Sequence, residues 1–352
     1  MNKLYWIIVF FGSYGFCQEY KLENEVLKGK IKSIELSVSK ENTAQTPIEH
    51  ILFDTKGRII QSKTFFNQRL HTFERNQYIK NQIVTDLCDY CDDLDKEFAH
   101  FSIKENQKNP YTGYATAEPR RTHKTIKTID KKGNIIRSKT FNSEGYLIWE
   151  KRLFYDKNSN LLETETFDDE GKKEPEFLKN TFNTKGLLIE SVNVMRHNNL
   201  KTIYEYDSQN RKKVEKIWQD NRVMEYHYIY KSTPDTSAVY KYSKNLEDHS
   251  LQLRTKELTY YEKGKKIICI TETYNNKITF VRVFEYDLQN KLRAKKYYND
   301  KNELRSETFL IYDKKGNWIE MNVSNLINTS YNGSEPKPVW HKNTYYRKIE
   351  YY

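Results

Sequence analysis

The chain has 352 residues, a formal net charge of +11, 30% charged and 37% hydrophobic residues, and a mean hydropathy of -0.91. This composition provides too little apolar side chain for a thick two-layer core, whereas an aromatic content of 14%, with 28 Tyr, argues against a disordered chain. Tyrosine adds apolar area and keeps a hydroxyl for water, so the composition suits a sheet that is wet on both faces.

Residues 1–17 have the features of a secretory signal peptide. Lys3 supplies a positive start, residues 7–11 are apolar, and Gly15-Phe16-Cys17 resembles a cleavage site before Gln18. The apolar run is too short to span a bilayer, and Phe16 occupies the place where a lipoprotein signal needs a small residue. We therefore expect cleavage and export to the periplasm or the outside, with a lipoprotein as the less favoured alternative. Cleavage would remove only Lys3 among charged residues and lower the net charge to +10.

A five-residue phrase recurs ten times in the remaining chain, and it predicts the architecture. Each copy has an aromatic residue, then Asp or Asn, two further residues, and Gly, Asn or Ser; Ile129 alone replaces the aromatic residue. The copies are Phe53–Gly57, Ile129–Gly133, Phe141–Gly145, Tyr155–Ser159, Phe167–Gly171, Phe182–Gly186, Tyr206–Asn210, Tyr286–Asn290, Tyr298–Asn302 and Tyr312–Gly316.

The phrase predicts a tight turn with a left-handed residue at its end. Asp or Asn can accept a hydrogen bond from the backbone two residues on, and Gly or Asn tolerates a positive φ three residues on. The expected turn anchors are Asp54, Gly57, Asp130, Gly133, Asn142, Gly145, Asp156, Asp168, Gly171, Asn183, Gly186, Asp207, Asn210, Asp287, Asn290, Asn299, Asn302, Asp313 and Gly316.

The segments between these turns are expected to be strands. From Asp130 the anchors follow at steps of 12, 14 and 12, and from Asp287 at steps of 12 and 14, so equivalent side chains would stack in ladders across strands. We therefore predict an all-β antiparallel β-hairpin repeat array, a meander that forms a single extended or curled sheet, over residues 18–352. Charged residues in mid-strand positions argue against a transmembrane barrel, whose strands need apolar residues facing lipid.

These phrases resemble the YD repeats of the Rhs family, whose signature begins Tyr-Asp-x-x-Gly. The likeness covers most of the chain except about 86–125 and 229–258, and YDKKGNWIEM with the terminal RKIEYY is similar to the end of short exported YD-like proteins of Bacteroidota. The resemblance implies the repeat fold. It does not imply the Rhs toxin, because this chain has no Asp-Pro cleavage pair.

The stretch from Asp86 to about residue 125 is expected to be a loop-rich insertion, and it contains a C-x-x-C pair. Cys88 and Cys91 lack the two further soft ligands that zinc needs, and the surrounding acids disfavour a reactive thiolate. The acids also lack the spacing of a calcium loop. In an exported chain we expect a local disulfide, and we expect Cys269 to be a buried strand thiol.

No catalytic motif is recognisable in the sequence. The eight His residues are scattered, and the carboxylates Glu163 with Glu165, and Glu205 with Asp207, recur as ordinary ladder positions. We therefore expect no cofactor, no metal and no enzymatic activity, but a binding or structural module, with an acidic polysaccharide or another envelope component as its partner. Export makes nucleic acid an unsuitable partner. A glycan-active enzyme, a toxin-associated or immunity protein, and lysines that serve only solubility remain alternatives.

Overall fold

The computed structural model describes residues 27–40, 44–91, 93–104, 107, 122–195, 198–219, 222–244, 251–263, 265–273, 277–329 and 337–352. The predicted signal peptide, with Cys17 and Gln18, lies outside this part of the chain, as does most of the predicted insertion after residue 104.

The described chain forms twenty-two strands and one short helix. The first eleven strands are β1 Ile31–Lys40, β2 Thr46–Phe53, β3 Ile59–Phe66, β4 Arg69–Ile79, β5 Gln82–Asp89, β6 Thr122–Ile129, β7 Ile135–Asn142, β8 Leu147–Tyr155, β9 Leu161–Phe167, β10 Lys173–Phe182 and β11 Leu188–Met195. The others are β12 Asn198–Tyr206, β13 Lys212–Gln219, β14 Arg222–Ser232, β15 Thr236–Lys244, β16 Leu251–Glu262, β17 Lys265–Thr273, β18 Lys277–Tyr286, β19 Leu292–Asn299, β20 Leu304–Tyr312, β21 Trp318–Thr329 and β22 Lys337–Tyr351. The helix α1, Leu94–Glu97, lies between β5 and β6.

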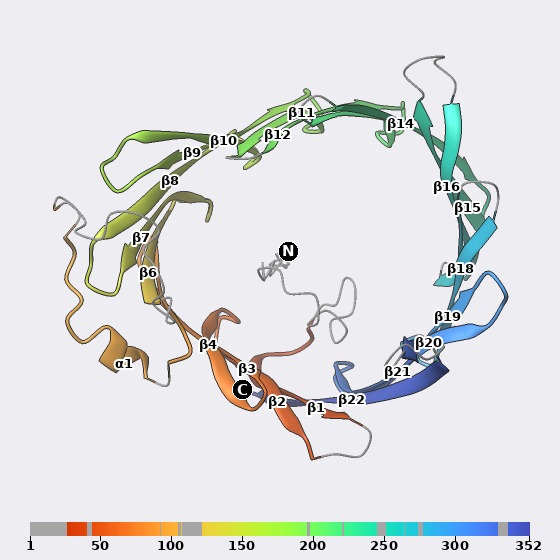
Figure 1. The fold of residues 1–352 in the computed structure, drawn as a ribbon, viewed down its shortest axis with the longest axis horizontal. Coiled ribbons are helices and arrows are strands. Elements are labelled where there is room, and N and C mark those ends of the chain that lie inside the picture. The colour runs from red at the N-terminus through yellow and green to blue at the C-terminus, as the bar shows by residue number, and fades with distance from the viewer. Residues whose placement is uncertain are drawn as a thin grey trace.

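The strands form a closed antiparallel barrel (Figure 1), in which each strand pairs with its neighbours in the chain. β22 also pairs with β1, from Ile31 opposite Tyr351 to Lys40 opposite Asn343. The all-β antiparallel meander is confirmed, but the prediction of a single extended or curled sheet is wrong. Closure pairs the backbone groups that an open sheet would leave free at both edges, and it depends on strand number and stagger, which a local turn repeat does not encode.

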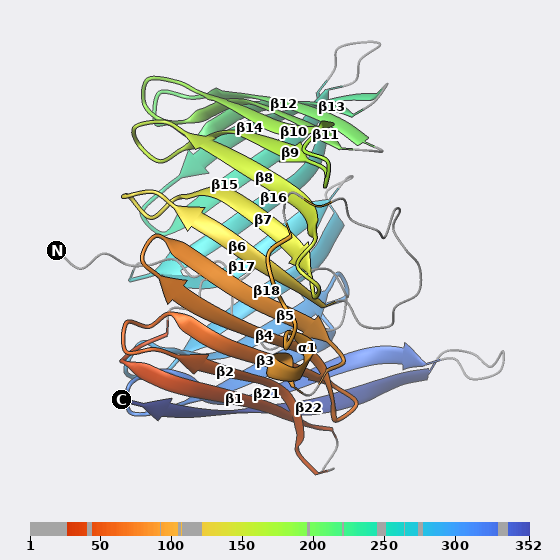
Figure 2. The same ribbon diagram turned by 90° about the vertical axis from the view of Figure 1, so that its left-hand side faces the viewer.

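All ten repeat phrases form the same turn. The last residue of each has a positive φ, from 60° at Asn302 to 91° at Gly133. In the first copy, the Gly57 N–H donates to the Asp54 carbonyl, and Asp54 Oδ1 accepts from the N–H groups of Lys56 and Arg58. Seven copies lie at the end of the barrel where β1 begins and β22 ends, which we call the terminal rim; Figure 2 shows it on the left.

The position of α1 distinguishes the two faces of the wall. The helix lies outside the ring in Figures 1 and 2, and it packs with Cys88 of β5 and Phe73 of β4, so these two side chains point outward. Neighbouring residues such as Asp89 and Thr72, which pair with each other, therefore point inward. Since side chains alternate along a strand and paired residues share a face, the register assigns the remaining positions.

The main apolar core lies on the inner face near the closing strands. It consists of the buried side chains Leu36, Leu310, Trp318, Met321, Val323 and Tyr345. Leu36 pairs with Glu49, Glu49 with Thr64, and Thr64 with Thr72, which places this cluster on the inward side. We call these strands, β20–β22 with β1 and β2, the closure seam.

Charged side chains occupy mid-strand positions of the outer face. Glu150 accepts from Arg137 and Arg152 at 2.8–2.9 and 2.6 Å, and Lys256 pairs with Glu272 at 3.0 Å. In the described ranges, no helix has the length and apolar character needed to cross a bilayer.

Candidate functional site

The predicted anchor residues are placed in the turns and use their polar groups there. In the copy at Asp156, Oδ1 accepts from the N–H groups of Asn158 and Asn160, and Oδ2 accepts from the Asn160 side chain. The backbone hydrogen bond from Asn160 lowers the pKa of Asp156 more than partial burial raises it. The anchors are spread around both rims, so the fold does not bring them together as one site.

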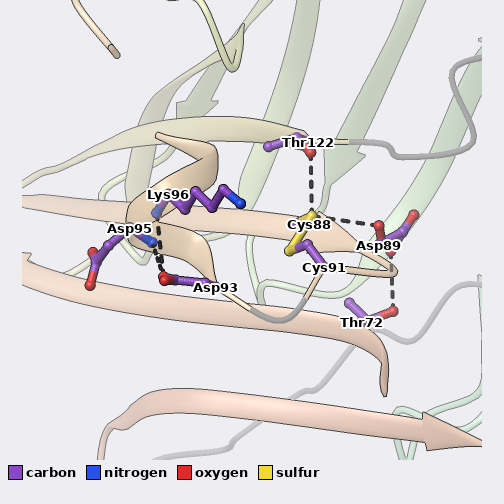
Figure 3. The surroundings of a disulfide bond; sticks show 8 residues. All are labelled: Thr72, Cys88, Asp89, Cys91, Asp93, Asp95, Lys96 and Thr122. Carbon is purple, nitrogen blue, oxygen red and sulfur yellow. Dashed lines mark hydrogen bonds between the residues drawn. A yellow bond between two sulfur atoms is a disulfide. The ribbon is translucent and has the colours of Figure 1, made fainter. Parts of the chain in front are cut away.

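The C-x-x-C pair holds a short insert against the outer wall (Figure 3). The Cys88 and Cys91 sulfurs are bonded, the Thr122 hydroxyl donates to Cys88 Sγ at 3.3 Å, and Asp93 caps α1 by accepting from the N–H groups of Asp95 and Lys96. Leu94, which is 1% exposed, completes the cluster with the disulfide. These contacts give the pair a structural role. Asp92 lies outside the described residues.

The segment after α1 continues along the wall to the turn at Asn142–Gly145. The Lys104 N–H donates to the Gly145 carbonyl at 2.9 Å, and the Phe101 and Phe141 rings meet edge to face. A Cβ atom at Gly145 would lie 1.7 Å from the Ser102 carbonyl oxygen. This glycine therefore serves both the turn and the approach of the insert. Cys269 is a buried free thiol in β17, as predicted.

The carboxylates considered as glycosidase candidates do not converge in a cavity. Glu163 and Glu165 lie on the outer face of β9, opposite Phe154 and Arg152 of β8. Glu165 forms an ion pair with Lys173 at 2.5 Å. Glu205 pairs with Val214 on the outer face, whereas Asp207 binds the Arg211 guanidinium within its own turn. Within the described residues, no group of three His, Cys, Asp or Glu side chains is arranged to hold a metal ion.

A cluster of tyrosines and lysines on the inner face of β12–β15 is the most distinctive chemical surface of the barrel. We call it the Tyr–Lys wall; it consists of Tyr204, Lys212, Glu215, Tyr226, Tyr228 and Lys241. Thr85 of β5 points inward, because it lies three residues before the outward Cys88. Successive cross-strand pairs carry this inward face from Thr85 through Thr140 and Leu178 to Leu200 of β12. Since Leu200 shares its face with Tyr204, the side chains of the wall point inward.

Each lysine of this wall lies over tyrosine rings. Lys212 Nζ is 4.9 Å from the Tyr204 ring centre and 5.5 Å from that of Tyr228. Lys241 Nζ is 3.8 Å from the Tyr226 ring centre. Ring faces attract cations, so these contacts hold the ammonium groups along the inner surface.

Glu215 links the tyrosines of the wall to its lysines. It accepts from the Tyr228 hydroxyl at 2.5 Å and pairs with Lys212 at 3.0 Å. Burial opposes ionisation of Glu215, but the bonds from Tyr228 and Lys212 outweigh it and lower the pKa of the carboxyl. Burial and the same carboxylate raise the pKa of Tyr228, which keeps its hydroxyl a donor. The six side chains carry two positive charges and one negative charge, so the wall is basic.

Sequence reasoning did not single out this wall, because the repeats were interpreted through their turns and not through the inward side chains of their strands. The signal was the alternation of Tyr226, Tyr228 and Tyr230 in YHYIY, which puts three tyrosines on one face of a strand. The lysines that lie over these rings come from other strands. Because the pairing register between strands is not known from the sequence, it could not be predicted which lysines contact which tyrosines.

Comparisons with known proteins do not assign a family. No family model matches the chain, and no curated protein matches it, so the resemblance to the Rhs family stays a prediction. Among solved structures, a porin-like protein from Bacteroides uniformis is similar at 12% identity and a TM-score of 0.30, over 92% of this chain and 99% of that one. TcdB2-TccC3 without its hypervariable C-terminal region is similar at 10% identity and a TM-score of 0.26, over 85% of this chain and 19% of that one.

Proposed function

We propose that the protein is an exported, non-enzymatic binding module that holds an acidic polysaccharide of the cell envelope against its inner wall. The observation that carries this proposal is the Tyr–Lys wall, where cations and aromatic rings alternate on one inward surface. A carboxylated sugar chain presents anionic groups to lysines and ring faces to tyrosines. Barrels of sixteen strands or more enclose a space wider than their own side chains fill, which leaves room for such a chain.

Binding to a polygalacturonate probe tests this proposal. We expect the double variant Lys212→Gln/Lys241→Gln to lower the affinity of the full exported chain at least tenfold. The matched control is Lys201→Gln/Lys216→Gln, which removes two lysines that form ion pairs on the outer face, and we expect it to change affinity less than twofold. Affinity should also fall steeply with salt, because exposed charges are screened. Equal losses in both double variants would contradict an inner binding surface.

The alternative of a glycan-active enzyme is tested with the same probe. We expect no shortening of polygalacturonate on prolonged incubation with the protein. Turnover that disappears in Glu165→Gln, with an unchanged circular dichroism spectrum, would overturn the non-enzymatic part of the proposal.

A further inference from the structure

At the terminal rim, tyrosine hydroxyls bridge neighbouring strands whose connecting turn lies at the opposite rim. Tyr206 of β12 donates to the Leu188 carbonyl of β11 at 2.7 Å, and Tyr312 of β20 donates to the Leu292 carbonyl of β19 at 2.7 Å. Tyr78 and Tyr286 make the same bond to the preceding odd-numbered strand at 3.0 Å. In each case the acceptor is at or next to the first residue of that strand, so the hydroxyl closes the gap between two strand ends.

Tyr155 of β8 stands in the same place but makes no such bond. It pairs with Leu161 across its turn, just as Tyr206 pairs with Lys212. The equivalent acceptor would be the carbonyl of Ile135, the first residue of β7. Among the described residues, however, the Tyr155 hydroxyl has no hydrogen-bond partner. Toward the terminal rim, the last residue pair between β7 and β8 is Arg137 opposite Arg152. Between this pair and the rim, the two strands do not pair with each other.

This unbridged end opens into a cleft of about 710 Å³. Its lining includes Tyr155, Ile136 and Leu153, together with Phe154 and the two arginines. Phe154 is 44% exposed and Ile136 is 39% exposed, so the cleft offers bare apolar surface. Residues of both faces contribute, since Arg152 belongs to the outer set and Leu153 to the inner set. The cleft, which we call the slot, therefore lies at the rim beside the turns Ile129–Gly133 and Tyr155–Ser159, where the two faces of the wall meet.

The polar groups of the slot give it an excess of positive charge. Four cations contribute: Lys132, Arg137, Arg152 and Lys157. The two acids in the lining, Asp130 and Asp156, have their oxygens occupied by backbone and Asn side-chain donors of their own turns. Both arginines bind the Glu150 carboxylate. Four positive side chains and these three carboxylates leave a formal charge of +1. Burial and the nearby Asp130 charge raise the pKa of Tyr155, so its hydroxyl stays protonated and able to donate.

We propose that this slot is a binding site for one acidic sugar unit, a hydroxyl-rich ring that carries a carboxylate or a phosphate. Lys157 would hold the anionic group, since charged donors bind such oxygens most strongly, whereas Arg152 is already bound to Glu150. Ile136, which lies on the same inward face as Leu153 and Tyr155, would contact the apolar face of the ring, and the Tyr155 hydroxyl would bond a ring hydroxyl. Apolar surface with a few convergent polar groups is the usual make-up of a small-ligand site. The slot is separate from the Tyr–Lys wall and does not depend on it.

Titration calorimetry of the full exported chain with trigalacturonate tests the site. We expect Tyr155→Phe to weaken binding about tenfold, because it removes the free hydroxyl and keeps the ring. The matched control, Tyr206→Phe, removes a hydroxyl that is already bonded to the backbone, and it should change affinity less than twofold. We also expect Lys157→Gln to weaken binding five- to tenfold, whereas Lys131→Gln, at the same position of the neighbouring turn, should leave it unchanged.

Neutral trigalactose and inorganic phosphate define the ligand class. We expect trigalactose to bind at least tenfold more weakly than trigalacturonate, and phosphate alone to compete only at far higher concentration. Competition by phosphate at the same concentration as trigalacturonate would overturn the sugar assignment. Unchanged affinity in both Tyr155→Phe and Lys157→Gln would overturn the site. A loss of trigalacturonate binding in Lys212→Gln/Lys241→Gln alone would also overturn it, because the ligand would then lie on the Tyr–Lys wall.

Discussion

The closure seam and the Tyr–Lys wall are two parts of one inner surface that differ in burial. The seam buries Trp318 and Met321 at 1% and 0% exposure in an apolar cluster, and the cation over the Trp318 ring, Arg347, is only 9% exposed. On the wall, by contrast, Lys212 lies over the Tyr204 ring and keeps 35% of its side chain exposed. Both parts use the same strand geometry. The contrast indicates that the seam holds the barrel closed, whereas the side chains of the wall stay partly exposed.

Truncating a large side chain in each part gives the largest expected difference. We expect Trp318→Ala to lower the free energy of unfolding by about 3–5 kcal/mol, because it removes a fully buried ring and leaves a cavity. Tyr226→Ala on the wall should cost about 1 kcal/mol, which is typical of a partly exposed side chain. Urea unfolding followed by tryptophan and tyrosine fluorescence measures both. Similar losses in the two variants would remove the distinction between seam and wall.

The second test compares one repeat position inside and outside the seam. Asn317, 2% exposed, accepts from the Lys28 N–H and donates to the Lys28 carbonyl and to the Tyr351 hydroxyl. Asn317→Ala should cost about 2 kcal/mol, because it removes three hydrogen bonds of a buried side chain. Asn134→Ala, at the same place in another turn, should cost less than about 1 kcal/mol, because the Asn134 side chain donates only to Asp130 of its own turn and to the exposed Ser159 hydroxyl. Thermal unfolding of both variants decides the point.

The pH dependence of stability should involve both parts. Burial opposes ionisation of Asp313 in the seam, but donors that include Tyr351 and the Asn317 backbone lower its pKa below the ordinary 3.8. Glu215 on the wall is lowered from 4.5. A carboxyl whose folded pKa is lowered stabilises the fold fully above its unfolded pKa, and this contribution is lost as the pH falls through the folded value. Stability should thus be constant above about pH 4.5 and decline below it.

Single variants separate the two contributions to that decline. Glu215→Gln should remove the part that begins just below pH 4.5, and Asp313→Asn the part that begins below pH 3.8. Urea midpoints recorded from pH 6 to pH 2.5 measure both. An acid transition that neither substitution alters would show that other carboxylates control it.

Removing one hydroxyl from the wall gives the smallest expected effect. Tyr228→Phe deletes the bond to Glu215 and should lower the free energy of unfolding by about 1 kcal/mol. It should also move the pKa of Glu215 upward, because a donor to the charged form is lost. Carbon-13 detection of the Glu215 carboxyl during titration follows this shift. A Glu215 pKa that does not move would mean that Lys212 alone stabilises the carboxylate.

The sequence was sufficient to predict the strands and turns, because the residues of each repeat determine the geometry of its turn locally. Asp54 and Gly57 illustrate this, since an acceptor and a residue free to take a positive φ define the turn without distant contacts. Closure of the barrel could not be predicted from the sequence, because the pairing of Ile34 with Ile349 joins residues that share no local pattern. The wall and the slot were missed for a related reason. Lys241 meets Tyr226 and Tyr228 only through register, and Tyr155 differs from Tyr206 only in a bond that it does not make.

The pairing of the first strand with the last also sets the order in which the protein can finish folding. Ile34 and Ile349 are 315 positions apart (349 minus 34), and contacts of such long sequence separation form slowly because the intervening chain must first be organised. Until β22 is available, β1 exposes an unpaired edge that can pair with the β1 strand of another molecule. Until β22 pairs with β1, the incomplete sheet should therefore be a natural client for chaperones that shield strand edges.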